Sequence, residues 1–284
     1  MRPRKTWLLW LFLLPALFCV LWPVWFTLTA AFRSSDELVF LFGPALGLGG
    51  EGTQTSTWTL LPCWPTLQPI LQLLLDSPEF FVMFGNSLVQ TIPQVIGSLL
   101  VAAPAAWALA RYSFPGRSLV WGLYFLLMVL PFQVSMVPTF LVLRRLGLLD
   151  THWAVILPGM FAAFPVFFLH RGFQRIPASC LEAAYLDGAN EWICFSRIGV
   201  PLVSRTIFAV TMLQFWECWN SVEQPLAFLR TKALWPLSLY LPQVTAENFA
   251  LCCAASLVIL LPPLLAFWLG SGVLLSDMER GALK

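Results

Sequence analysis

The sequence predicts an all-α integral membrane protein that crosses the bilayer six times. Of its 284 residues, 59% are hydrophobic and only 11% are charged, whereas soluble domains are about 45–50% apolar and about 25% charged. Apolar runs of about 20 residues, the length that a helix needs to cross a bilayer, recur along the chain. Lipid is therefore the main solvent of this chain, and we expect one transmembrane domain over residues 1–284.

Six apolar runs are long enough to form the spans. The first follows a basic N-terminus but is longer than the apolar region of a signal peptide, about 7–15 residues, so we expect an uncleaved signal-anchor. Prolines inside several runs are compatible with membrane helices whose freed carbonyls are satisfied by neighbouring groups. The expected spans cover residues 7–32, 85–110, 118–139, 153–170, 204–220 and 249–275.

The basic residues orient the chain. Six spans place both termini on one side, and Lys and Arg accumulate on the cytoplasmic side of membrane proteins. Eleven of the 16 Lys and Arg residues fall at the termini or in loops on the side of the termini. We therefore expect a multi-pass protein of the cytoplasmic (inner) membrane with both termini in the cytoplasm. We also expect a cytoplasmic loop over 171–203 and an external stretch over 33–84 with a short surface helix near 67–75.

The composition argues against several other functions. A net charge of +2 is too small to suggest a nucleic-acid partner. The seven cysteines lack CxxC spacing and the two histidines form no metal-binding pair. The chain has no GxxxxGK[ST] phosphate loop and no H-E-x-x-H motif. We expect no catalytic residue, no metal site and no cofactor bound by this chain.

The cytoplasmic loop carries two short helices joined by a glycine turn. Ser179 and Glu182 have the spacing of a capping box at the start of the first helix. Gly188 suits the left-handed position at its end, Asn190 can cap the second helix, and Pro201 can end it. A compact helical pair that faces the cytoplasm is suited to docking another protein. Its expected apolar side consists of Leu181, Tyr185 and Leu186.

This loop resembles the EAA loop of ABC-importer permeases. The family pattern is E-A-A, three residues, G, nine residues and I-x-L-P, and the spacing here matches without gaps, with Val200 at the family's leucine. The matching residues are Glu182-Ala183-Ala184, Gly188 and Ile198-Gly199-Val200-Pro201-Leu202. Segments 85–88, 108–117, 146–151, 219–226 and 279–284 resemble the MalG-like permease subunits of carbohydrate importers. The resemblance covers residues 7–284 and is weakest over 33–80.

The resemblance implies a MetI-like ABC-importer permease fold with residues 171–203 as the coupling loop. The chain would pair with a second homologous permease subunit, and two cytoplasmic ATPase subunits would dock on the two EAA loops and use ATP. An extracytoplasmic solute-binding protein would deliver a sugar or oligosaccharide, which alternating access would move inward. Glu182 would accept a basic group of the ATPase, although it could also only cap its own helix. The implied docking residues are Glu182, Ala183, Ala184, Asp187, Gly188 and Pro201.

The expected fifth span carries a polar stripe. Glu217 lies about 12 residues into the span, which at 1.5 Å per residue is near mid-membrane, where an ionisable side chain is costly and usually functional. Gln214 and Ser221 share its helical face. We interpret this face, with Asn220, as the wall of a water-filled translocation path. The alternatives are a polar seam between helices, or a Glu217 that is protonated or lies nearer the outer surface.

Residues at the external end of this span could contact cargo. Asn220, Glu223 and Gln224 could bind sugar hydroxyls or the binding protein, or could be ordinary interfacial residues. Trp216 and Trp219 fit an interfacial aromatic belt better than sugar platforms. For function, the alternatives are a permease for a non-sugar solute such as a polyamine, or a secondary carrier or membrane enzyme. A carrier would be expected to show paired repeats and would not need an EAA loop.

Overall fold

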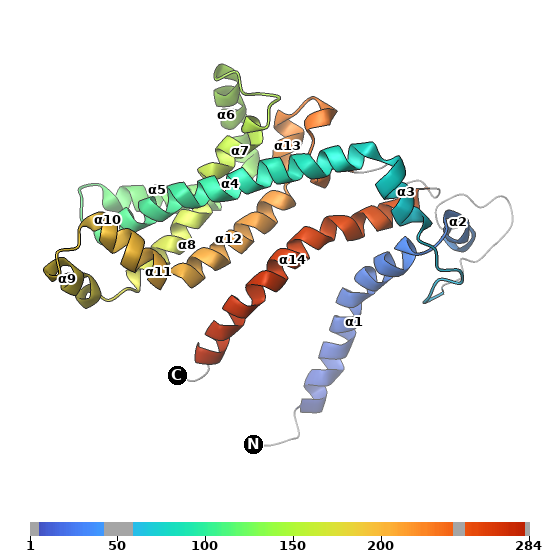
Figure 1. Ribbon diagram of the computed structural model, residues 1–284, viewed down its shortest axis with the longest axis horizontal. Helices are drawn as coiled ribbons and strands as arrows, with labels where there is room; N and C mark the ends of the chain where they lie inside the picture. Colours follow the sequence, from blue (N-terminus) through green and yellow to red (C-terminus); the bar gives the residue numbers. More distant parts are fainter. Residues whose placement is uncertain (1–5, 43–58, 241–247, 282–284) are drawn as a thin grey trace. The chain divides into compact units, whose positions relative to one another are not determined.

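The computed structural model describes residues 6–42, 59–240 and 248–281, and all regular structure in them is helical (Figure 1). Four helical stretches are long and apolar enough to cross a membrane, and there are up to six if each of two bent helix pairs forms one span. The all-helical membrane class is therefore confirmed. The limits of each span and the single-domain description stay predictions.

The chain divides into two compact units, of which the first comprises Met1–Phe81 and Tyr240–Leu261. It contains α1 (Thr6–Ala31), α2 (Ser35–Phe42), α3 (Gln68–Asp76) and the first part of α14 (Phe249–Gly281). Only 11% of the most apolar window of α1 is buried, which suits a helix that meets lipid on most sides. The core forms where the last turn of α1, with Ala30 and Ala31, meets α2 and α14.

One buried arginine ties together two parts of the stretch that was expected to be external. Arg33 is only 2% exposed and donates to the Thr59 side chain at 2.8 Å and to the Thr59 carbonyl at 2.6 Å. Its second partner is Glu37, at 3.4 Å. The surface helix expected near 67–75 is confirmed as α3, whereas α2 was not expected. Residues 43–58 of the expected external stretch lie outside the described residues.

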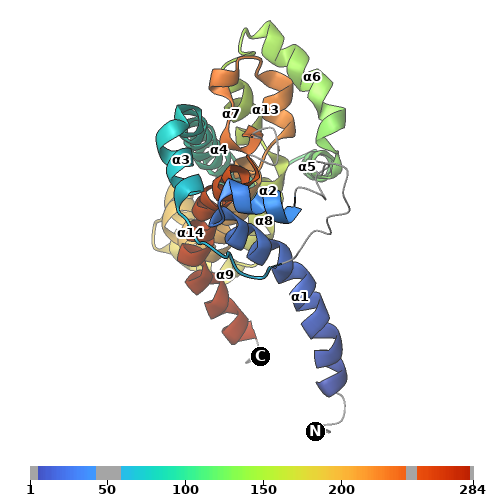
Figure 2. The same ribbon diagram turned by 90° about the vertical axis from the view of Figure 1, so that its right-hand side faces the viewer.

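The second unit comprises Val82–Leu239 and Pro262–Lys284. Its larger helices are α4 (Pro78–Arg111), α5 (Arg117–Val129), α6 (Phe132–Arg145), α7 (Trp153–Met160), α8 (Ala163–Gln174) and α12 (Ser204–Trp219). α8 packs against both α5 and α12. The short helix α13 (Glu223–Phe228) packs against α6 and α7, and the three lie close together in both views (Figures 1 and 2).

One face of α4 is polar and buried. Its polar side chains recur at helical spacing, so they lie on one side of the helix. The Ser87 hydroxyl accepts the backbone N–H of Leu237 at 2.7 Å, and the Gln90 amide donates to the Leu234 carbonyl at 2.9 Å. These bonds hold the segment that follows α13 against α4. The buried polar residues of this face are Ser87, Gln90, Thr91, Gln94 and Ser98.

The range expected for the third span, 118–139, holds two helices rather than one. α5 and α6 meet at 106° because Leu130 is extended, with ψ 125°, directly before Pro131. A proline ring pushes the preceding residue out of the helical region, so α5 ends there. The expectation that the prolines are accommodated inside continuous spans is wrong at Pro131, although Pro93 and Pro104 do lie inside continuous α4.

Candidate functional site

The coupling loop has the two helices that its sequence predicts. They are α9 (Ala178–Leu186) and the run formed by α10 (Glu191–Ile193), the π-helical turn η1 (Cys194–Gly199) and α11 (Val200–Leu202). Gly188 has φ +83°, and the N–H groups of Gly188 and Ala189 donate to the carbonyls of Tyr185 and Ala184 at 3.0 and 2.9 Å. This is the Schellman arrangement. The expected left-handed turn at Gly188 is confirmed.

Three finer expectations for this loop meet different outcomes. Asn190 caps the second helix as expected, since its side chain accepts the Ile193 N–H at 2.8 Å. The capping box is wrong, because extended Pro177 is the N-cap of α9 and no side chain caps it, which places Ser179 two positions too late. Pro201 does not end the second helix. That helix continues to Leu202, and the wide π turn just before the proline suits a residue that lacks an N–H.

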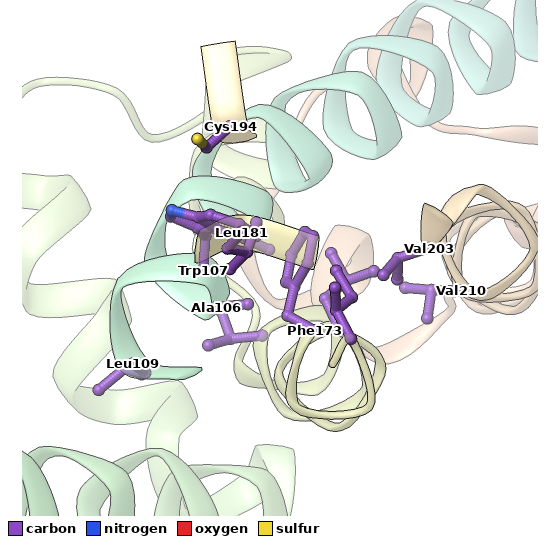
Figure 3. Close-up of a cluster of buried hydrophobic side chains, with 12 residues drawn as sticks. Ala106, Trp107, Leu109, Phe173, Leu181, Cys194, Val203 and Val210 are labelled. Atoms are coloured by element: carbon purple, nitrogen blue, oxygen red, sulfur yellow. The ribbon is translucent and has the colours of Figure 1, made fainter. Parts of the chain in front are cut away.

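The inner face of the coupling loop is anchored in the main apolar cluster of the second unit (Figure 3). Leu181 is 6% exposed and Cys194 is fully buried. The Trp107 ring of α4 packs edge-on against Phe173 and Phe195, with centroids 5.3 and 5.8 Å apart. The loop is therefore packed onto the ends of α4 and α8.

Polar bonds make a second connection between the loop and α4. The Glu191 carboxylate accepts the Tyr112 hydroxyl at 2.7 Å and the Tyr185 hydroxyl at 2.9 Å. The bond to Glu191 raises the pKa of the Tyr112 phenol, and burial together with the same carboxylate raises the pKa of Tyr185. Arg111 donates to the carbonyls of Phe173 and Ile176 at 2.7 and 2.8 Å. The hydrogen bonds from Tyr112 and Tyr185 to Glu191 are called the Glu191 clamp below. Sequence reasoning missed the clamp because Tyr112 is far from Glu191 in the chain.

The outer face of the loop carries most of the implied docking residues. Glu182, Ala183, Asp187 and Pro201 are exposed, whereas Ala184 is half-buried against the apolar cluster. The expected apolar side is divided, because Leu181 points into the core while Leu186 is 89% exposed and Tyr185 is 43% exposed. Trp192, which the sequence did not single out, is 67% exposed. The loop thus presents carboxylates and large apolar side chains together.

A cleft of about 880 Å³ opens beside α12 in the second unit. All six residues expected to line the path or contact cargo lie on it: Gln214, Glu217, Asn220, Ser221, Glu223 and Gln224. Other walls come from α4, α5, α6, α7 and α8. Sequence reasoning missed these walls, which include Gln94, Met128, Phe132, Phe164 and Thr139. The polar residues of the expected second span, such as Gln94, were the signal that could have revealed one of them.

The amides of the cleft are held in place while one carboxylate is free. Gln214 is 4% exposed and its amide nitrogen lies 3.5 Å from the Cys218 sulfur. Asn220 donates to the Trp216 carbonyl at 3.0 Å, and Gln224 to the Val155 carbonyl at 3.3 Å. Glu217 is exposed and makes no hydrogen bond or ion pair with any residue that the structure describes.

The second carboxylate and the two tryptophans of this region differ in their surroundings. Both oxygens of Glu223 accept the Gln133 amide, at 2.8 and 2.9 Å. Trp216 is 52% exposed on the cleft. Trp219 is 2% exposed and packs edge-on against Phe84, with centroids 5.9 Å apart. The interfacial-belt interpretation is therefore wrong for Trp219.

A close helix approach shapes the floor of the cleft. A Cβ added at Gly159 of α7 would overlap the side chain of Gln94 on α4, and one added at Gly97 would overlap Met160. Glycine at these two positions lets the helices meet and brings Gln94 to the cleft. Among the described residues, no three His, Cys, Asp or Glu side chains gather as metal ligands. The site therefore offers binding groups of the kind that recognise hydroxyls, namely amides, hydroxyls and carboxylates.

Comparisons with known proteins agree with this architecture. The chain is 27% identical over 285 residues to the arabinooligosaccharides transport system permease protein AraQ of Halalkalibacterium halodurans, covering 99% of this chain and 98% of that protein. It is 33% identical to a probable ABC transporter permease of Pyrococcus horikoshii, covering 78% of this chain and 82% of that protein. Both relatives are transport components, as the coupling-loop resemblance implies.

A solved structure and a family model extend the comparison. A chain from the crystal structure of a bacterial ABC transporter involved in the import of the acidic polysaccharide alginate has the same fold, with a TM-score of 0.75 and 21% identity over 96% of this chain and 98% of that chain. The family model for the inner membrane component of binding-protein-dependent transport systems matches residues 98–271, which include the coupling loop and the residues of α12 and α13. The chain is therefore a member of the family of binding-protein-dependent transport system inner membrane components, the membrane permeases of ABC importers.

Proposed function

We propose that this chain is one of two membrane subunits of an importer that moves a sugar or oligosaccharide across the cytoplasmic membrane. A second homologous permease completes the path, two ATPase subunits supply the energy, and an extracytoplasmic binding protein delivers the cargo. Both termini and the coupling loop face the cytoplasm. This chain binds no cofactor, and ATP is used by the ATPase subunits alone.

The coupling loop is the observation that carries this proposal. Its inner face is fixed by the apolar cluster around Trp107 and by the Glu191 clamp, while Glu182, Asp187 and Leu186 point outward. A rigid element with an exposed polar and apolar face can receive a partner and transmit its displacement to the helices behind it. A mobile loop with the same residues would absorb that displacement. ATPase closure would thus move α4 and α8 through the loop.

The cleft supports carbohydrate as the cargo. Sugars present hydroxyl groups around a ring with apolar faces, so they are recognised by hydrogen-bonding side chains next to aromatic surfaces. The cleft supplies Asn220 and Glu217 together with the exposed Trp216 and with Phe132 and Phe164. The relative from Halalkalibacterium halodurans is a component of an arabinooligosaccharide system, which is consistent with this chemistry.

Co-purification tests the docking role. The partner subunits are co-expressed with the wild-type chain, Glu182→Arg or Gly188→Asp, and the ATPase retained by the affinity-tagged permease is quantified. We expect Glu182→Arg to lose the ATPase, because it reverses the charge of the docking face, and Gly188→Asp to retain less of it than the wild type, because it places a charged side chain at φ +83° in the turn. Asp76→Arg, a charge reversal on exposed α3, should retain it. Full retention by Glu182→Arg would show that the docking assignment is wrong.

Uptake by the assembled importer tests the cargo. Proteoliposomes that contain all subunits receive labelled neutral oligosaccharides or labelled spermidine, with ATP inside or absent. We expect ATP-dependent accumulation of at least one neutral oligosaccharide and none of spermidine. Accumulation of spermidine alone would replace the carbohydrate assignment with the polyamine alternative.

A further inference from the structure

The charged side chains on the cleft are all of one sign. Glu217 and Glu223 lie on it, and no Lys, Arg or His of the described chain lines it. Glu223 accepts hydrogen bonds from the Gln133 amide through both oxygens. Glu217 has no partner of opposite charge among the described residues. The cleft is therefore negatively charged and holds no cation that could neutralise a bound anion.

The walls of the cleft strengthen this field. Much of the lining is apolar, with Leu127, Met128, Phe132 and Phe164 among its residues. Clefts lined by charges of one sign and by walls of low dielectric constant focus the field, and they change local ion concentrations by about 10- to 1,000-fold. An anionic cargo would be depleted by this field, whereas a neutral cargo would be unaffected.

Neutral sugars suit the same groups. A carboxylate that lacks a cation can accept hydrogen bonds from sugar hydroxyls, and the exposed Trp216 offers an apolar surface beside Glu217. A uronate or phosphate group would instead need Arg or Lys, which bind these anions through charge-assisted hydrogen bonds. We infer that the cleft of this chain selects against anionic cargo, so that the importer carries neutral oligosaccharides rather than uronate- or phosphate-bearing ones.

This inference rests on the proposed function and differs from what the structural neighbour does. The transporter with the similar fold is involved in the import of the acidic polysaccharide alginate. At 21% identity the backbone is shared but the charges on the cleft need not be. The fold thus sets where the cleft lies, and Glu217 and Glu223 set which charge it accepts.

Thiol-modification rates measure the charge of the cleft without knowledge of the cargo. Ser221, a half-buried residue on the cleft, is changed to Cys together with Cys218→Ala. The whole importer is assembled with its partner subunits in detergent, where both faces are open to reagent. It is treated with one of three methanethiosulfonate reagents, which carry a cationic trimethylammonioethyl group, an anionic sulfonatoethyl group or a neutral group. Modification at position 221 is followed by mass spectrometry and compared with the reaction of free cysteine.

The ratio of cationic to anionic rates decides the inference. Relative to free cysteine, we expect this ratio to be at least about tenfold higher in the cleft and to fall as salt is added. The matched variant with Glu217→Gln and Glu223→Gln should bring the ratio close to that of free cysteine. A persistent high ratio in this variant would show that other groups set the charge, and the assignment to the two glutamates would be wrong.

The remaining outcomes separate this inference from the proposed path. Equal rates for the two charged reagents, or a faster anionic reagent, would overturn charge selection while the path itself remained open to water. No reaction with any of the three reagents would show that the cleft is closed to water, which would overturn both the path and the inference drawn from it.

Discussion

The coupling loop and the cleft belong to the same unit, but Glu191 of the loop and Glu217 of the cleft have opposite surroundings. Glu191 is bound by two tyrosine hydroxyls, and the turn beside it is closed by the backbone bonds around Gly188. Glu217 on the cleft has no such partner in the described chain. On the proposed function, a loop that transmits force must keep its shape, which the bonds to Glu191 favour. A path that receives cargo needs a polar group free for it, and Glu217 is such a group.

Gly199→Ala should have the largest effect, because it breaks the packing that anchors the loop. The added Cβ would lie 2.5 Å from the Trp107 ring, whereas one added at Gly122 of α5 would meet nothing within 4 Å. Overpacking costs about 1–3 kcal/mol, so the melting temperature of the solubilised protein should fall. Gly122→Ala should leave it unchanged or raise it, because Ala is favoured over Gly inside helices. Equal melting temperatures for both variants would mean that the loop is not anchored at Trp107.

Gly188→Ala should have a slightly smaller effect on the same part. An L-residue in the left-handed region costs about 1–2 kcal/mol, and Asn tolerates that region better than Ala does. We therefore expect weaker binding of the ATPase subunit by Gly188→Ala, with Gly188→Asn between it and the wild type. Binding measured by titration of the purified ATPase gives this order. If Gly188→Ala binds as tightly as the wild type, the turn is not required in its observed form.

Tyr112→Phe sharpens the comparison by removing one bond to Glu191 while preserving the ring. A hydrogen bond contributes about 0.5–1.5 kcal/mol, and the low end applies because the pair is exposed. Amide hydrogen exchange in α9 and α10 should become faster, with no change in α13. Tyr124→Phe on α5, for which no hydrogen bond is seen in the described chain, is the control. Unchanged exchange in α9 and α10 would show that the Tyr112 bond to Glu191 does not stabilise the loop.

The smallest expected effect comes from a change at Asp150, which binds the segment just after α13. Its carboxylate accepts the Thr231 hydroxyl at 2.6 Å and the N–H groups of Thr231 and Arg230 at 2.8 Å, just after α13. These bonds, the Thr231 hydroxyl first, lower the pKa of Asp150 below its ordinary 3.8. A lowered pKa stabilises the folded state above the ordinary value, and this contribution is lost as the pH falls through the lowered pKa.

The pH dependence can be isolated with one substitution. Asp150→Asn cannot ionise, so the melting temperature of the wild type should fall relative to that of the variant as the pH is lowered from 6 to about 3. Asn also tolerates the left-handed backbone of this position, where φ is +59°. A constant difference between the melting temperatures of the wild type and Asp150→Asn across this pH range would show that the Asp150 bonds do not contribute to stability.

The contrast between the two regions also explains what the sequence predicted. Gly188 and Asn190 were assigned correctly because a turn and a cap depend on neighbours within a few residues. The capping box at Ser179 failed because the helix, with Pro177 as its N-cap, begins two positions earlier than the pattern suggests. The expectation for the third span failed because Leu130, directly before Pro131, is extended and ends α5. Features that depend on neighbouring residues were thus predicted correctly, except at Pro177 and Pro131, where a proline sets a helix boundary.

Only some of the residues that line the cleft could be predicted from the sequence. One wall, formed by α12 and the residues just after it, was predicted from a helical period in one segment, so Gln214, Glu217 and Ser221 could be grouped from sequence. Gln94 and Phe164 come from helices whose approach depends on tertiary packing, including the glycine contact at Gly159. The Glu191 clamp joins segments that are 79 residues apart and leaves no periodic signal. Long-range partners of this kind require the folded chain.

Separation of docking from transport tests the central claim most directly. The reconstituted importer is compared for bound ATPase and for ATP-driven uptake of the neutral oligosaccharide that the wild type accumulates. On the proposed function, Glu182→Arg should lose both, because energy would enter at the coupling loop. Glu217→Leu should keep its ATPase but lose uptake, because cargo would pass along the cleft. Unchanged uptake by Glu217→Leu, or loss of its ATPase together with uptake, would contradict the assignment of docking and transport to two different regions.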